Sequence, residues 1–137
     1  MHWSIKNESR LLVFNRIIKA VKKNVDICLF EGNTFSYASL DKSYELAHSI
    51  MYGELKGGID PAGADEHWKT GNTALERIRI SFANEGYSVK TSFVGAAIVS
   101  AMAGEIYNQL KNETLTNAAN LTNNNQLTEY CNWLIQL

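Results

Sequence analysis

Hydrophobic and polar positions along the chain recur with two different periods, which distinguish predicted helices from predicted strands. Apolar residues between Ser9 and Lys22 recur at helical spacing, which predicts an amphipathic helix there. Val25–Phe30 is a short run of β-forming residues that ends in a turn at Gly32, so a strand follows that helix. Ser49–Lys56 has the same character and ends before two glycines, which predicts a second strand.

A longer helix is predicted from Ala64 to Asn84, where large apolar residues recur three, four or seven positions apart. They are Trp68, Leu75, Ile78 and Phe82. Gly86 follows as a candidate C-terminal cap, and the only proline lies in the preceding loop, Ile59–Gly63. The segment Ser36–His48 is ambiguous between loop and helix, with helical character near Asp41.

The last third of the chain predicts a strand within Tyr87–Val99, a helix Ala101–Lys111 capped by Ser100, and a final helix Gln126–Leu137. Asn112–Asn125 is rich in asparagine and threonine, which predicts a loop with helix caps. The elements therefore follow the order α-β-β-α-β-α-α. This order predicts the α/β (α+β) class, with one small mixed β-sheet flanked by helices.

Length and composition are those of one globular domain. The chain has 137 residues, of which 45% are hydrophobic and 20% charged, enough for a buried core. No run approaches the ~18 apolar residues of a membrane span, and the first residues lack the pattern of a signal peptide. Cys28 and Cys131 lie far apart and form neither a disulfide framework nor a zinc motif. These features predict a cytoplasmic protein that does not bind membranes.

Charge is unevenly distributed along a chain whose net charge is −1. Residues 1–30 contain six Lys and Arg against two acids, and the rest of the chain is acidic or balanced. The one basic cluster is Lys19, Lys22 and Lys23. A nucleic-acid-binding domain usually carries a basic surface, so the overall balance argues against DNA binding.

The second predicted strand carries the most informative chemistry, together with an aspartate on the first. Strand alternation places Glu54 and Lys56 on one face and turns Leu55 toward the core. Asp26 adds a carboxylate from the neighbouring strand. Because magnesium binds oxygen ligands and keeps several waters, Asp26, Glu54 and the Leu55 backbone carbonyl could hold one ion. Lys56 would then position a water and offset negative charge at a phosphate.

This D…(D/E)-x-K arrangement has an ordinary alternative. A Glu-x-Lys triplet occurs by chance in most proteins of this size, and spacing alone favours a solvated strand face for Glu54 and Lys56. Asp26 is equally ordinary as an acid at the start of a strand. The surrounding sequence decides between the two interpretations.

The run Gly53–Thr70 resembles the catalytic signature of type II restriction endonucleases of the AvaI/BsoBI type, within the PD-(D/E)XK nuclease superfamily. Its letters are GELKGGIDPAGADEHWKT. Asp26 lies 28 residues before Glu54, where that family has its first metal-binding aspartate. The similarity extends through Ala74–Arg79 and returns weakly at Asn124–Leu127 and Trp133–Ile135.

The resemblance implies one PD-(D/E)XK-like catalytic domain over residues 1–137, with a restriction-endonuclease-like fold. It implies magnesium (Mg²⁺) as cofactor and double-stranded DNA as substrate, cut at a specific sequence. A homodimer is expected, because palindromic half-sites mirror a two-fold axis in the protein. Enzymes of this type also carry an N-terminal region that helps to embrace DNA, so the resemblance covers only their catalytic, C-terminal half.

His67 lies near the start of the long predicted helix. Taken alone, it is a surface imidazole close to a helix N-terminus, where positive charge is disfavoured. The resemblance implies instead that His67 is an active-site residue that orients the attacking water or accepts its proton. The neighbouring Trp68 is assigned to the core because it lies on the apolar stripe.

Four further residues are candidate DNA contacts, and each has a structural alternative. Asp60 is either a turn-forming residue or an acceptor for a cytosine amino group, and the sequence favours neither. Lys69 either contacts a phosphate or is a solvated helix residue. Lys22 and Lys23 form either a solvated helix end or a phosphate-contacting edge beside the metal site.

Three functions are compatible with these residues. The first is a magnesium-dependent, sequence-specific endonuclease in which Asp26 and Glu54 hold the metal, Lys56 positions the nucleophile and His67 assists. The second is an inactive, truncated remnant of such an enzyme. The third is a non-catalytic DNA- or protein-binding domain on the same scaffold, which the intact Asp26, Glu54 and Lys56 disfavour.

Overall fold

The computed structural model describes residues 1–33 and 40–137, and within them six strands form one sheet in the order β1-β2-β3-β4-β5-β6. The strands are β1 His2–Ile5, β2 Glu8–Ile18, β3 Lys23–Glu31, β4 Ser49–Lys56, β5 Lys90–Gly95 and β6 Asn117–Asn120. β1 to β4 pair antiparallel, whereas β4, β5 and β6 pair parallel. The predicted mixed sheet is confirmed.

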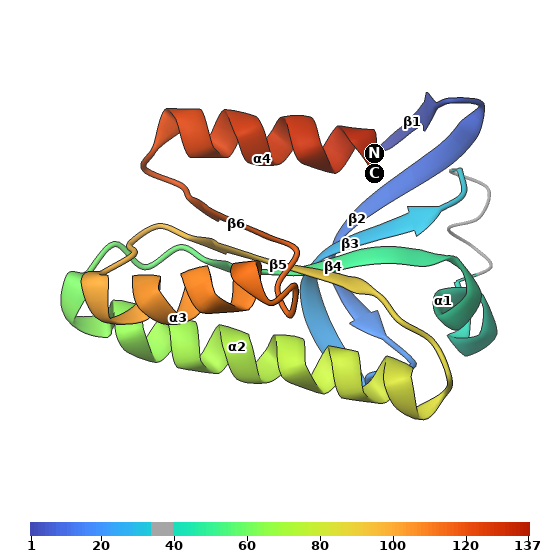
Figure 1. The fold of residues 1–137 in the computed structure, drawn as a ribbon. Helices are drawn as coiled ribbons and strands as arrows, with labels where there is room; N and C mark the ends of the chain where they lie inside the picture. The colour runs from blue at the N-terminus through green and yellow to red at the C-terminus, as the bar shows by residue number, and fades with distance from the viewer. Residues whose placement is uncertain (34–39) are drawn as a thin grey trace.

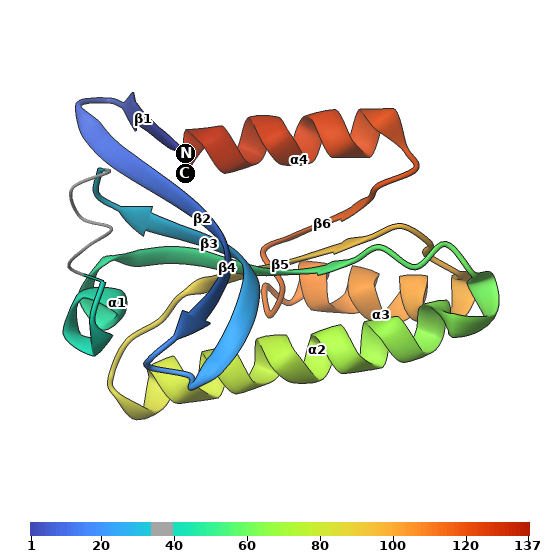
Figure 2. The same cartoon turned by 180° about the vertical axis from the view of Figure 1, so that it is seen from behind.

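Helices cover both faces of this sheet. In the described ranges they are α1 Lys42–His48, α2 Pro61–Asn84, α3 Ser100–Lys111 and α4 Asn124–Gln136. α2 and α3 lie against one face and α4 lies across the other (Figure 1). From behind, the hairpin that joins β2 to β3 is seen to reach α2 (Figure 2). None of these helices is both long and apolar enough to cross a membrane.

Local signals define both ends of α2. Asp60 is the N-cap, and its carboxylate accepts the N–H of Ala62 at 3.0 Å, so the helix begins earlier than the predicted Ala64. At the other end Gly86 has a φ of 82°, and the N–H of Tyr87 donates to the carbonyl of Phe82. The predicted cap at Gly86 is therefore confirmed. The predicted apolar stripe is buried, which packs the helix on the sheet.

The predicted helix Ser9–Lys22 is wrong, because residues 8–18 form β2. Leu12 lies opposite Leu29 of β3, while Leu11 packs into the core on the other face of the sheet. A strand that is buried on both faces has adjacent apolar residues, which imitate helical spacing. Asn15, with a φ of 51°, also interrupts the alternation that identifies a strand.

The other differences concern the ends of elements and short edge strands. α3 begins at Ser100 itself, and its N-cap is Val99, which makes no side-chain capping bond. The predicted strand within Tyr87–Val99 is limited to β5, and the predicted loop Asn112–Asn125 contains β6. β1 had no predicted counterpart. In the ambiguous segment Ser36–His48, helix α1 follows Asp41, and residues 34–39 lie outside the described residues.

Candidate active site

The pairing of β3 with β4 places the two predicted metal-binding carboxylates on adjacent strands. Ile27 pairs with Gly53, so Asp26 and Glu54 are the next residues on each strand. Gly53 permits this close arrangement, because a Cβ at that position would lie 2.7 Å from Ser92 Oγ and 3.3 Å from Ile27 Cβ. The strands therefore approach each other closely beside the two acids.

Lys56 joins the two carboxylates into one cluster. Its Nζ atom lies 3.0 Å from Glu54 Oε2 and 3.9 Å from Asp26 Oδ2. Asp26 Oδ2 also accepts the backbone N–H of Leu55 at 2.8 Å, which orients this carboxylate toward β4. The structure thus brings Asp26, Glu54 and Lys56 together on one side of the sheet.

The cluster faces α2, which reverses one prediction about β4. Glu54 is 5% exposed, whereas Leu55 is 41% exposed, so Leu55 does not face the core. Glu54 shares its face of β4 with Tyr52, which packs into the core against α2. Lys56 lies on the same face, and a Cβ on Gly71 of α2 would be 3.7 Å from its Cε. Glu54 is buried because its face of β4 is covered by α2 at this point, whereas the apolar Leu55 lies on the opposite face and is partly exposed.

Glu54 is a buried carboxylate in contact with the ammonium group of Lys56. Burial raises the pKa of Glu54, and the charge of Asp26 raises it further. The hydrogen bond from Lys56 acts in the opposite direction and lowers that pKa. A divalent cation between Asp26 and Glu54 would relieve the same repulsion, so the site is suited to binding positive charge.

The donor set fits a hard oxygen-binding cation. Within residues 1–33 and 40–137, no group of three or more His, Cys, Asp or Glu is placed to hold a metal. Two carboxylates with water and substrate oxygens suit magnesium, which rarely needs a complete protein cage. The Leu55 carbonyl stays a predicted third ligand, whereas the Leu55 N–H is the group that contacts Asp26.

His67 lies on the first turns of α2 and is exposed. Its ring packs against the loop that follows β4, because a Cβ on Gly58 would lie 2.5 Å from His67 Nε2. Among the described residues, His67 makes no hydrogen bond or ion pair with the carboxylate–lysine cluster. Hydrogen bonds and ion pairs of the described residues therefore do not join His67 to the cluster, and its catalytic role stays a prediction.

The four predicted DNA contacts occupy different environments. Asp60 caps α2, so its structural interpretation is observed. Lys69 Nζ lies 2.6 Å from Asp65 Oδ2, and this hydrogen bond raises the pKa of Lys69. Lys22 and Lys23 are exposed where β2 turns into β3, and Lys23 also lines a hollow beside the carboxylate cluster. Of these four residues, Lys23 is the one that lines a hollow together with Glu54.

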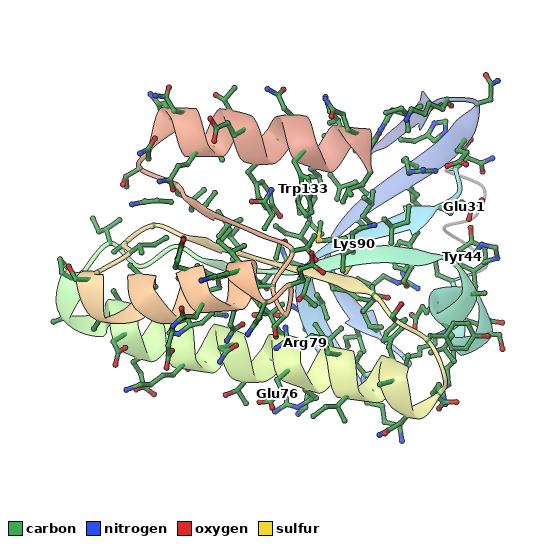
Figure 3. All side chains as sticks on the ribbon, in the orientation of Figure 1. Glu31, Tyr44, Glu76, Arg79, Lys90 and Trp133 are labelled. Atoms are coloured by element: carbon green, nitrogen blue, oxygen red, sulfur yellow. The ribbon has the colours of Figure 1, made fainter. Side chains whose placement is uncertain are left out.

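Sequence reasoning missed Arg77 of α2, whose charge also lowers the pKa of Glu54. Its neighbours on the helix point elsewhere, since Arg79 donates to Thr91 Oγ1 at 3.0 Å while Glu76 faces away from the sheet (Figure 3). The helical periodicity of α2 predicts only that Arg77 is exposed to solvent. Its proximity to Glu54 depends on how α2 packs on β4, which no local pattern shows.

A mixed, curled sheet with this cluster on β3 and β4 is compatible with a restriction-endonuclease-like fold. The sequence pattern of the restriction endonuclease BsoBI family matches residues 1–137. The chain belongs to that family, which confirms the resemblance drawn from Gly53–Thr70.

Individual relatives agree with this assignment. The type II restriction enzyme BsoBI of Geobacillus stearothermophilus is 50% identical over 135 residues, which are 98% of this chain and 42% of that enzyme. The type II restriction enzyme AvaI of a Nostoc species is 46% identical over 144 aligned residues, covering 100% of this chain and 43% of that enzyme. AvaI of Anabaena variabilis gives the same values. The chain thus spans less than half the length of these relatives and matches their C-terminal part.

Proposed function

We propose that residues 1–137 form the single catalytic domain of a magnesium-dependent endonuclease that cuts double-stranded DNA at a specific sequence. The observation that carries this proposal is the contact of one ammonium, that of Lys56, with carboxylates from two adjacent strands. The family assignment supports it, because the relatives are type II restriction enzymes.

Asp26 and Glu54 would hold the magnesium ion, with the Leu55 carbonyl as a further oxygen ligand. When bound, the ion would polarise a phosphate oxygen and make a bound water more acidic. The buried position of Glu54 favours this arrangement, since charges interact more strongly away from bulk water.

Hydrolysis forms a bond from a water oxygen to phosphorus and breaks one ester bond. The water gives up a proton, and the leaving oxygen gains one. Lys56 would offset the negative charge that develops on the phosphate, because its ammonium is already held beside Glu54. His67, on the loop side of α2, would orient the water or accept its proton.

DNA contacts by Lys22, Lys23 and Lys69 would be to phosphates, and Asp60 would read a base from the N-terminus of α2. The net charge of −1 limits the number of phosphate contacts, so we expect weak binding at physiological salt. A homodimer would match a palindromic site, and we expect a cytoplasmic location.

A second candidate is an inactive remnant that folds without cutting DNA. The observation in its favour is that the chain covers only 42% and 43% of the two relatives' lengths. The relatives therefore have an additional region that this sequence does not match.

Incubation of the purified chain with supercoiled plasmid, in MgCl₂ or in EDTA, tests the proposal. We expect discrete linear fragments in magnesium and intact plasmid in EDTA. A chain that is folded by circular dichroism yet leaves the plasmid intact at every magnesium concentration would support the remnant.

A further inference from the structure

A hollow of about 230 Å³ opens beside Glu54, between the β2–β3 hairpin and α2. Its lining includes the apolar residues Val25 and Ile78 and the charged residues Glu54, Lys23 and Arg77. Asn24 adds a neutral polar residue to this lining. The hollow therefore connects the buried carboxylate with two basic groups on different elements.

The two basic groups have no acidic partner among the described residues, unlike some cations elsewhere on α1 and α2. Lys42 is paired with Glu85 and Lys69 with Asp65. In the part of the chain that the structure describes, neither Lys23 nor Arg77 has a carboxylate within ion-pair distance. Their positive charge is thus available to a ligand.

The charges around the hollow favour an anion. The carboxylates of Asp26 and Glu54 are already in contact with Lys56. Lys23 and Arg77 add two further cations, so three positive groups face two negative ones. A metal ion at the carboxylates would increase this positive excess, and the excess matches the charge of a phosphodiester backbone.

Arg77 also lines a second hollow, of about 330 Å³, along the exposed side of α2. Thr70, Thr73, Lys69 and the acidic Glu66 line that hollow, and Ala74 and Arg77 are common to both. Arg77 therefore lies where a path along α2 meets the hollow beside Glu54. A nucleic-acid strand that passes the carboxylate cluster would place successive phosphates along such a path.

We propose that Arg77 and Lys23 form a binding site for a DNA phosphate adjacent to the one that is cut, with Arg77 as its principal ligand. The planar guanidinium can donate two parallel hydrogen bonds to phosphate oxygens, which an ammonium cannot do. Arg77 would position the strand against Asp26 and Glu54. This inference rests on the proposed function, because it takes the carboxylate cluster as the cutting site.

The test compares Arg77→Ala, Arg77→Lys and Lys90→Ala with the wild-type chain. Lys90 is the control, because it is an exposed cation far from the cluster along the sheet. Its backbone pairs with that of Met51, at the opposite end of the β4–β5 ladder from Lys56 and Gly95. Fluorescence anisotropy with a fluorescein-labelled DNA duplex, in EDTA and over a range of salt concentrations, gives the affinity and its salt dependence without cleavage.

We expect Arg77→Ala to weaken affinity about tenfold, as for the loss of a hydrogen bond to a charged group. The slope of log affinity against log salt should fall by about 1, the value for one lost phosphate contact. Arg77→Lys should keep the wild-type slope with reduced affinity, and Lys90→Ala should match the wild type in both. Thermal unfolding should be unchanged in Arg77→Ala, because the side chain is exposed.

The outcomes separate this inference from the proposed function. If the wild type binds and cuts DNA but Arg77→Ala behaves like Lys90→Ala, the phosphate site is wrong and the endonuclease proposal stands. If the slope of log affinity against log salt falls in Arg77→Lys as it does in Arg77→Ala, a charge contact at position 77 is contradicted. If the wild type neither binds nor cuts DNA, the proposed function fails and the phosphate site fails with it.

Discussion

Glu54 on β4 and Glu45 on α1 are both buried, and burial raises the pKa of each carboxyl. Their surroundings differ. Glu45 Oε2 accepts the backbone N–H of Ala20 at 3.0 Å, and its buried Oε1 has no hydrogen-bond partner among the described residues. Glu54 contacts Lys56, lies next to Asp26 and opens onto a hollow.

The comparison shows that burial and a raised pKa do not identify an active site by themselves. Glu45 connects α1 to the end of β2, which is a structural role. Glu54 has what a metal-assisted reaction requires, namely a second carboxylate, a lysine in contact with both acids, and access from outside. Substitution of Asp26 or Lys56 removes this difference between the two glutamates.

The largest effect should come from the residues that distinguish Glu54 from Glu45. If the chain cuts DNA, Asp26→Asn and Lys56→Met should each lower the cleavage rate about 10²-fold or more, because a preorganised charge at the reacting phosphate is lost. Lys111→Met, at the exposed end of α3, is the control and should cut at the wild-type rate. Single-turnover plasmid cleavage measures all three. A wild-type rate for both site variants would remove the distinction between the two glutamates.

The close packing of α2 on the sheet covers Glu54, and Gly71 makes it possible. A Cβ there would lie 2.8 Å from Phe93 Cε2, so Gly71→Ala should destabilise the fold by about 1–3 kcal/mol through overpacking. In Gly104→Ala the Cβ meets no atom within 4 Å, and we expect equal or higher stability. Urea unfolding compares the two variants, and equal stabilities would contradict the packing account.

A smaller effect is expected at Asp60, where a cap and a base contact are alternatives. Asp60→Ala should cost about 1 kcal/mol of unfolding free energy, whereas Asp60→Asn should keep the cap and the stability. A base contact would appear in Asp60→Asn as an altered preference for the cleaved sequence at unchanged stability. Full stability in Asp60→Ala would show that the cap contributes nothing.

The smallest effect concerns the pH dependence of stability through Glu45. Its raised pKa means that the folded protein holds this proton more tightly than the unfolded chain. The unfolding free energy should therefore fall as pH rises from the ordinary glutamate value of 4.5 through the raised pKa. Glu45→Gln cannot titrate and should flatten that decline, as measured by urea unfolding at several pH values. An unchanged profile would show that Glu45 does not contribute.

Parts of the fold are readable from the sequence because their signals are local. β4 ends at two glycines and has the predicted bounds, and α2 has a cap at each end and an apolar stripe. β2 is not readable, because Leu11 and Leu12 are buried on opposite faces and Asn15 breaks the alternation. Burial on both faces of the sheet therefore produces helix-like spacing of apolar residues in a segment that is a strand.

The candidate site is readable to a similar extent. Asp26, Glu54 and Lys56 are recognisable because the surrounding run Gly53–Thr70 resembles a catalytic signature, whereas spacing alone favours a solvated strand face. The structure brings these three residues together. The orientation of Leu55 and the proximity of Arg77 to Glu54 depend on the packing of α2, which the sequence of neither element specifies.

The most direct test of the proposed metal-dependent site is the rate of plasmid cleavage in magnesium by Glu54→Gln and Glu45→Gln, each measured against the wild type. Both variants remove the charge of a buried carboxyl and keep its size. We predict that Glu54→Gln lowers the rate about 10²-fold or more, while Glu45→Gln keeps the wild-type rate. Equal losses in the two variants, or full activity in Glu54→Gln, would contradict the assignment of the active site to β3 and β4.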